Sequence, residues 1–157
     1  MTSPSKILAF AASNSRDSIN KMLVTHAANV LQEELIPDSE ITILDLNDYE
    51  MSIYSIDREN ESGIPELATA FYKAIGDADL ILVSYAEHNG TYSAAYKNIF
   101  DWCSRIDGKV FQNKPMMIMA TSPGGRGAAS VLKVAEESSG YFGVDLRGSL
   151  SVGSFYD

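Results

Sequence analysis

The sequence predicts an α/β fold, a doubly wound sheet of five parallel strands within one domain. Short apolar runs, such as Ile7–Ala12 and Leu80–Val83, alternate along the chain with segments whose apolar residues recur every three or four positions. A continuous apolar run is typical of a strand covered on both faces, and the longer spacing is typical of a helix with one buried face. Because strands and helices alternate through short connections, the pattern indicates βαβ units and a parallel sheet.

The first half of the chain contains two expected strands, two expected helices and one irregular segment. Ile7–Ala12 is the first strand, and the helical spacing of Ile19–Leu35 ends where a proline follows. Glu40–Leu46 holds four apolar residues in seven and is expected to be the second strand. Asn47–Ser62 is polar and has no period, so we expect it to be irregular. Pro65–Ile75 opens on a proline and is the second expected helix.

The second half continues the alternation with three strands and two helices. The strands are expected at Leu80–Val83, Pro115–Ala120 and Val144–Val152, and the helices at Thr91–Ile106 and Arg126–Ser138. No internal repeat, low-complexity segment or linker interrupts the series. We therefore expect residues 1–157 to form a single domain, which is an ordinary size for one hydrophobic core.

Charge and cysteine content exclude several classes of protein. The net charge is −9, and a field of that sign repels nucleic acid and anionic lipid. We expect neither nucleic acid nor a membrane as partner, and the sequence shows no signal peptide and no long apolar span. The single cysteine, Cys103, cannot form an internal disulfide or a cysteine-rich metal site, which suits the cytoplasm.

The loop after the first strand is a candidate anion site. Ligands of open parallel sheets bind beyond the carboxyl ends of the strands, which is where this loop lies. It holds Ser13, Ser15 and Ser18, two asparagines and Arg16, directly before a helix. Hydroxyls, free amides at a helix N-terminus and an arginine suit a phosphate group. The alternative is that Ser18 only caps the helix, which explains one of these residues but not the rest.

The loops after the third and fourth expected strands are also polar and rich in glycine. Ala86–Thr91 could hold a flat heterocycle with its backbone and amide groups, or could merely cap the next helix with Thr91. Thr121–Gly127 has three glycines in four positions, which lets the backbone approach a ligand closely or turn tightly. His88 has no partner at metal-ligand spacing, so we expect no metal. We expect His26 to be structural and Cys103 to be a buried small hydrophobe.

At these three loops the sequence resembles the NADPH-dependent FMN reductase family, a flavodoxin-like group that includes quinone, chromate and azo-dye reductases. The resemblance spans residues 6–156. Ala12–Asn20 is similar to the family's Gly-Ser-x-Arg-x-x-Ser-x-Asn phosphate loop. Ala86–Thr91, with Lys97–Trp102 beyond it, is similar to its Pro-Glu-Tyr-Asn-Gly-Ser loop and Leu-Lys-Asn-x-x-Asp-Trp helix. Thr121–Gly127 is similar to its Ser-Pro-Gly-Gly-x-Gly loop.

The resemblance implies strand order 2-1-3-4-5 and a bound FMN with NADPH or NADH as hydride donor. The phosphate would be held from the first loop, the flavin ring would lie against the second, and the third would close its other edge. The residues expected at the cofactor are, in chain order, Ser13, Ser15, Arg16, Ser18, Ile19, Asn20, Ala86, Glu87, His88, Asn89, Gly90, Ser122, Pro123, Gly124, Gly125 and Arg126. No side chain is expected to act as catalytic acid, base or nucleophile, because the flavin N5 accepts the hydride.

Several positions depart from the family's pattern. Ala12 replaces a glycine, the loop arginine is displaced to Arg16, Ala86 replaces a proline, and His88 replaces a tyrosine. The chain also stops at Asp157, where members continue into a final helix. We therefore expect the apolar face of the last strand, with Val144, Leu146 and Leu150, to lack its helix. Either a neighbouring subunit covers this face or the sequence is part of a longer protein, and we expect the second.

The function implied is transfer of electrons from the nicotinamide cofactor through FMN to a small acceptor. Quinones, free flavins, azo compounds and metal oxyanions are all candidates. An FMN-binding electron carrier and a non-enzymatic module of the same fold remain alternatives. Members are usually dimers or tetramers, and we expect Trp102 and Arg105 to lie in the interface.

Overall fold

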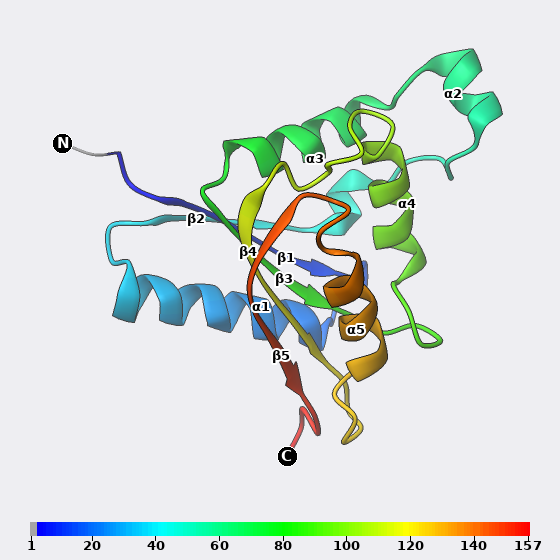
Figure 1. Ribbon diagram of the computed structural model, residues 1–157. Helices are drawn as coiled ribbons and strands as arrows, with labels where there is room; N and C mark the ends of the chain where they lie inside the picture. Colours follow the sequence, from blue (N-terminus) through cyan, green and yellow to red (C-terminus); the bar gives the residue numbers. More distant parts are fainter. Residues whose placement is uncertain (1–2) are drawn as a thin grey trace.

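A computed structural model describes residues 3–157, so the first two residues of the predicted domain lie outside the described range (Figure 1). Five parallel strands form one sheet in the order β2-β1-β3-β4-β5, which confirms the predicted topology. The strands are β1 Lys6–Ala12, β2 Glu40–Leu44, β3 Leu80–Tyr85, β4 Lys114–Thr121 and β5 Val144–Val152.

The helices cover the two faces of the sheet unequally, as Figure 1 shows. Helix α1 lies on one face, and α3, α4 and α5 lie on the other. Two short helices, α2 and the 3-10 helix η2, follow β2, and a single π turn, η1, extends α1. The bounds are α1 Ile19–Val30, η1 Leu31–Leu35, η2 Leu46–Tyr49, α2 Ile56–Ser62, α3 Glu66–Asp77, α4 Ala94–Cys103 and α5 Ala129–Ser138.

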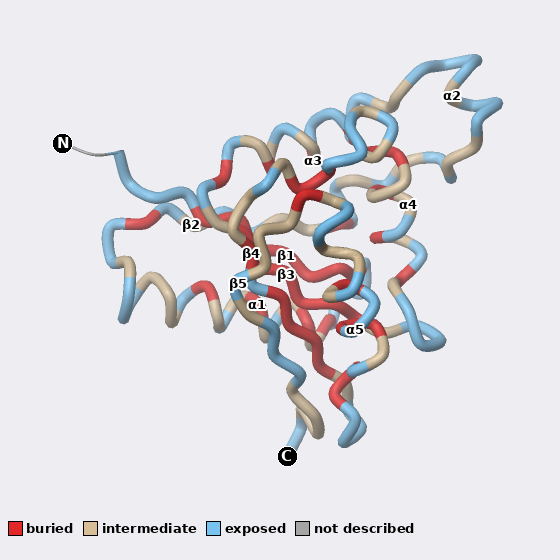
Figure 2. Tube along the Cα trace, in the orientation of Figure 1, coloured by how far each residue is buried: buried red, intermediate tan, exposed pale blue. Residues whose placement is uncertain are grey.

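The core is correspondingly thick on one face and thin on the other. Successive strand residues point to opposite faces, so Leu8 and Phe10 of β1 pack toward α3 and α4 while Ile7 and Ala9 pack toward α1. The larger side is rich in aromatic rings, and Phe10 meets Phe71 edge to face with centroids 5.3 Å apart. Burial of β1 and β3 on both faces explains their continuous apolar sequence (Figure 2).

The segment predicted to be irregular, Asn47–Ser62, is partly helical. The second strand ends at Leu44, because Asp45 accepts a hydrogen bond from the Asn47 amide and starts η2. Helix α2 begins at the N-cap Ser55, and Gly63, at φ +73°, follows its end. The prediction was wrong because α2 has one apolar residue, Ile56, and buries no side chain, so the sequence shows no apolar period there.

Helix α4 begins later than predicted. Ser93 caps α4 by accepting from the Tyr96 amide, whereas Thr91 pairs with His88 in the preceding loop. The interpretation of Thr91 as the cap was therefore wrong. The prediction failed because either residue suits an N-cap and only the fold chooses between them.

The predicted apolar face of β5 is divided between the two sides of the sheet. An irregularity opposite Met116 and Met117 shifts the register, so Leu146 pairs with Met116 and packs on the large core. Beyond it Leu150 pairs with Met119 and is 55% exposed, and Figure 2 shows β5 as the least buried of the last three strands. The expectation that Val144, Leu146 and Leu150 share one face was wrong, because one extra residue reverses the alternation.

Candidate functional site

The three loops singled out in the sequence meet at one edge of the sheet. The strand order changes direction between β1 and β3, and ligands of such sheets bind beyond the carboxyl ends at that point. A hollow of about 280 Å³ lies there. Its lining includes, among the predicted residues, Ser13, Ser15, Ser18, Ile19, Asn20, Ala86, Glu87, His88, Ser122 and Pro123. The sequence reasoning missed Asp17, Thr121 and Tyr156, which also line it.

The remaining predicted residues lie outside this lining. Asn89 and Gly90 occupy the exposed tip of the β3–α4 loop, and Gly124, Gly125 and Arg126 form the exposed β4–α5 turn. Arg16 lines a neighbouring hollow on the outer side of α1, together with Lys21 and the exposed His26. The predicted set therefore gathers at one end of the sheet, although not in one hollow.

The first loop presents hydrogen-bond donors around the N-terminus of α1. Ser18 is the N-cap, and its Oγ accepts from the Lys21 amide at 3.2 Å, so Ser18 does cap α1, while its contact with phosphate stays a prediction. Its hydroxyl proton stays free to donate. Among residues 3–157, the amides of Arg16 and Asp17 find no partner, and the first turn of α1 adds its unpaired amides. The loop therefore retains donors for an anion.

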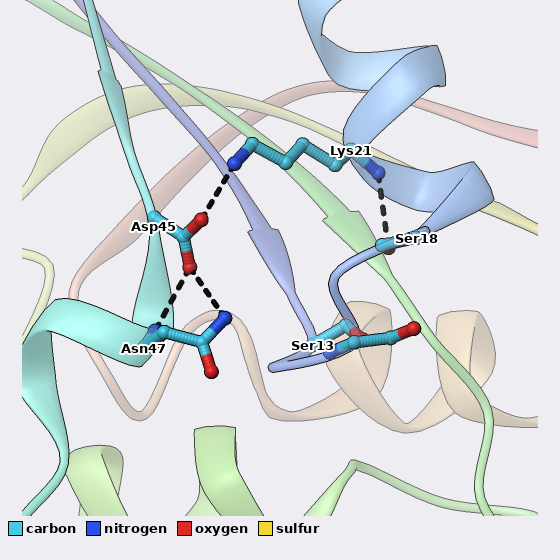
Figure 3. A network of polar contacts seen from close by, with 6 residues as sticks. Ser13, Ser18, Lys21, Asp45 and Asn47 are labelled. Atoms are coloured by element: carbon cyan, nitrogen blue, oxygen red, sulfur yellow. Dashed lines mark hydrogen bonds and ion pairs between the residues drawn. The ribbon is translucent and has the colours of Figure 1, made fainter.

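A lysine that the sequence reasoning missed braces the start of α1 against β2 (Figure 3). Lys21 Nζ lies 2.6 Å from Asp45 Oδ2, and Asp45 Oδ1 accepts from the Asn47 amide at 2.9 Å. These hydrogen bonds lower the pKa of Asp45 from 3.8 to about 2, with the Lys21 bond as the largest cause. The contact orients Lys21 away from the hollow, toward the end of β2.

Asn20 connects the carboxyl ends of β3 and β4. Its Oδ1 accepts from Ser84 Oγ at 2.7 Å and from the Thr121 amide at 3.0 Å, and its Nδ2 donates to the Thr121 carbonyl at 3.2 Å. The side chain is 3% exposed. Most of the hydrogen-bonding groups of the Asn20 amide are thus engaged within the protein. A contact between Asn20 and phosphate stays a prediction.

The second loop is held by a carboxylate and closed by a tight turn. Glu87 Oε1 accepts from the Val131 amide of α5 at 2.8 Å, so this side chain points across to the neighbouring helix. His88 and Thr91 exchange two backbone hydrogen bonds, and Asn89 and Gly90 between them have φ of +53° and +84°. The turn leaves the backbone at its tip open to a ligand.

The third loop packs against the chain that follows β5. The Gly124 carbonyl accepts from the Ser154 amide at 3.0 Å. A Cβ on Gly127, at φ +59°, would lie 2.8 Å from the Gly153 amide nitrogen, so this glycine is required by backbone packing. Nothing lies within 4 Å of a Cβ placed on Gly124, which leaves that position open for a close approach.

Trp102 does not lie on the outer surface, which corrects the interface expectation. It is 1% exposed, and its indole N–H donates to the Ser52 carbonyl at 2.8 Å. The covering segment, residues 51–62, forms an arm over α4, and Asn98 holds this arm further by accepting from the Tyr54 amide at 2.8 Å. Arg105 pairs with Glu59 of the arm at 2.8 Å. The helix face was misjudged because the arm was expected to be irregular.

A larger hollow lies on the other side of the first loop. It measures about 360 Å³ between η2, the arm and α4. Asn98 in its wall already donates to the carbonyls of Met51 and Ser52, so its amide is engaged within the protein. The smaller hollow, where all three loops converge, is therefore the candidate functional site.

Comparison with known proteins identifies the family. The family profile described as NADPH-dependent FMN reductase matches residues 5–154. This chain belongs to the NADPH-dependent FMN reductase family. A 2-hydroxy-1,4-benzoquinone reductase from Burkholderia is 35% identical over 125 residues, covering 79% of this chain and 64% of that protein. An NADPH:quinone oxidoreductase from Arabidopsis thaliana is 31% identical, covering 80% and 62%. The chain thus spans a little under two thirds of these relatives.

Solved structures agree with the family assignment. The flavoenzyme FerB, an NAD(P)H:(acceptor) oxidoreductase from Paracoccus denitrificans, superposes with a TM-score of 0.70 at 25% identity, covering 91% of this chain and 75% of that one. The azoreductase AzrA superposes with a TM-score of 0.74 at 16% identity, covering 97% and 89%, which shows the shared fold. The flavodoxin-like architecture is confirmed.

The residues of the three loops suit FMN, the cofactor in the family's name. A phosphomonoester needs several donors, and the first loop offers two hydroxyls, free amides and the exposed Arg16. A flat ring needs a slot, and residues 86–88 of the second loop and 121–123 of the third both line the hollow. Within residues 3–157 no three metal-ligating side chains gather. In the same range no helix is long and apolar enough to cross a membrane.

Proposed function

We propose that this protein is an FMN-dependent NAD(P)H oxidoreductase that passes electrons to a small acceptor. The observation that carries the proposal is the convergence of the loops after β1, β3 and β4 on one hollow with a donor-rich end. The names of the relatives, quinone reductases and an oxidoreductase of FerB type, support this over an electron carrier or a non-enzymatic module. A quinone is the acceptor we favour, with free flavin, azo compounds and metal oxyanions as further candidates.

The residues would divide the work of holding FMN between the loops. Ser15, Ser18 and Arg16 would bind the phosphate, because each carries a donor that the described chain leaves free. The backbones of 86–90 and 122–126 would flank the ring. When bound, FMN supplies hydride acceptance from NADPH or NADH and electron delivery to the acceptor. Fixed backbone amides around the ring would stabilise the negative charge that it gains on reduction.

Steady-state kinetics test this proposal. Protein loaded with FMN should oxidise NADPH or NADH rapidly when 1,4-benzoquinone is added and much more slowly without it. Protein freed of FMN should lose that activity and regain it when FMN is restored. Bound FMN that is reduced only by a protein partner, with no turnover of either nicotinamide, would favour the electron carrier instead.

A paired substitution tests the phosphate assignment. Changing Ser15→Ala together with Arg16→Ala should raise the Kd for FMN at least tenfold, since a hydrogen bond to a charged group contributes ~1.5–3 kcal/mol. The Kd for riboflavin, which lacks the phosphate, should not change. An equal loss for both ligands would show that the first loop does not hold the phosphate.

We also propose that the protein is a homodimer or homotetramer of the cytoplasm. The lone thiol of Cys103 suits a reducing compartment. On the arm, two large apolar side chains that lie close in the chain, Ile53 and Ile56, are 69% and 52% exposed, and neighbouring exposed apolar side chains can mark a protein interface. Light scattering at micromolar concentration should give at least twice the mass of one chain.

Two substitutions on the arm test where the chains meet. Changing Ile53→Ser and Ile56→Ser should weaken association, whereas Leu35→Ser, at a 72% exposed control position, should not.

A further inference from the structure

Helix α5 begins without a cap of its own. Its N-cap position is Ala128, which lies in the left-handed region at φ +57° and has no side-chain acceptor. A helix N-terminus leaves its first amides unpaired unless a neighbouring group accepts from them. N-cap residues usually carry a side-chain oxygen that accepts from these amides, so in α5 the acceptor must come from another residue.

The acceptor comes from Glu87, which belongs to a different loop. Val131 is the third residue of α5, and its amide is the one that an N-cap side chain would ordinarily serve. Glu87 Oε1 lies 2.8 Å from that nitrogen, although the two residues are 44 positions apart in the chain. A carboxylate is a strong acceptor at this place, because the hydrogen bond is charge-assisted and the helix dipole favours a negative charge.

This contact joins the two loops that border the ring slot. Glu87 stands between Ala86 and His88, which line the hollow, and α5 follows directly from the glycine turn that includes Gly124 and Gly125. One hydrogen bond therefore links the second loop to the helix that follows the third loop. The Glu87 carboxylate points toward α5, so this side chain is engaged in the contact with α5.

We propose that Glu87 is a positioning residue that fixes the width of the slot by docking the second loop onto the N-terminus of α5. The identity of the slot's occupant, the FMN ring, rests on the proposed function. The docking itself does not, because it belongs to the protein without cofactor.

Two substitutions and one control test this docking in protein free of FMN. In Glu87→Ala the Val131 amide should exchange its hydrogen about fivefold faster, the change expected for a lost N-cap of ordinary strength. Glu87→Gln keeps an oxygen that can accept and should restore most of the protection. The matched control is Glu137→Ala, which removes a 69% exposed carboxylate from the same helix and should leave Val131 unchanged.

Ligand binding separates positioning from a general structural role. Glu87→Ala should weaken FMN and riboflavin by the same factor, of about tenfold, because the slot for the ring is altered and the phosphate site is not. Glu87→Gln should recover the affinity for both. Unchanged Val131 exchange in Glu87→Ala would overturn the proposal, and so would a loss of FMN affinity with riboflavin unaffected. If the unmodified protein bound neither flavin, the proposed function would fail, while exchange at Val131 would still decide the docking.

Discussion

Replacing Asn20 with alanine should destabilise the protein by about 3 kcal/mol. The side chain makes three buried hydrogen bonds, to Ser84 Oγ and to both backbone groups of Thr121. Ser84 and Thr121 are 0% and 2% exposed, so the alanine variant would leave buried polar groups without their partner. At ~1 kcal/mol for each broken hydrogen bond, the three together give the expected loss. Urea unfolding measures it as a lower midpoint at unchanged slope.

An isosteric variant shows whether the hydrogen bonds or the packing carry the effect. Asn20→Asp keeps the shape but places an oxygen where Nδ2 donates to the Thr121 carbonyl, 3.2 Å away. Two facing acceptors repel, and the charge would be buried, so this variant should be at least as unstable as the alanine variant. The control Asn29→Ala changes an exposed residue of the same helix and should cost far less. An alanine variant within 1 kcal/mol of the unmodified protein would show that these hydrogen bonds do not hold the ends of β3 and β4 together.

Three further outcomes are expected. Ser18→Ala should weaken FMN binding and also cost ~1 kcal/mol of stability in the cofactor-free protein through its lost cap; a loss of stability alone would show that Ser18 is only a cap. Because the pKa of Asp45 is lowered to about 2, the charged Asp45 stabilises the fold above pH 4, and this contribution should disappear as the pH falls from 4 to 2. In Lys21→Met that pKa should return toward 3.8 by NMR titration, and an unchanged value would show that Lys21 does not lower it. Burial raises the pKa of Cys103 to about 12, so a thiol reagent should label the native protein slowly and the unfolded protein quickly; equally fast labelling would contradict its burial.

The central strands were predictable because burial on both faces constrains nearly every residue in them. β1 and β3 are covered on both faces, so nearly every side chain had to be apolar, and the run itself marks the strand. Helix α2 carries no such mark, since none of its residues is buried and its N-cap Ser55 resembles any loop serine. The register shift in β5 also leaves no signal in the sequence, because it arises from the pairing of β5 with β4.

The candidate site was predictable in position but not in detail. Three polar loops at the carboxyl ends of parallel strands had to meet, and they do. Which side chains face the hollow depends on partners far along the chain. Glu87 turns to α5 because Ala128 offers no cap, and Asn20 turns inward because Ser84 and Thr121 need partners. Trp102 was misplaced for the same reason, since the arm that buries it was not predicted to be ordered.

An absorption titration with FMN decides whether the protein is a flavin-dependent oxidoreductase. FMN should bind at one molecule per chain, with a perturbed visible flavin spectrum, and anaerobic addition of NADPH or NADH should bleach that band. Adding 1,4-benzoquinone should restore it. Protein that took up no FMN, or bound FMN that kept its colour in the presence of both nicotinamide cofactors, would contradict the proposed function.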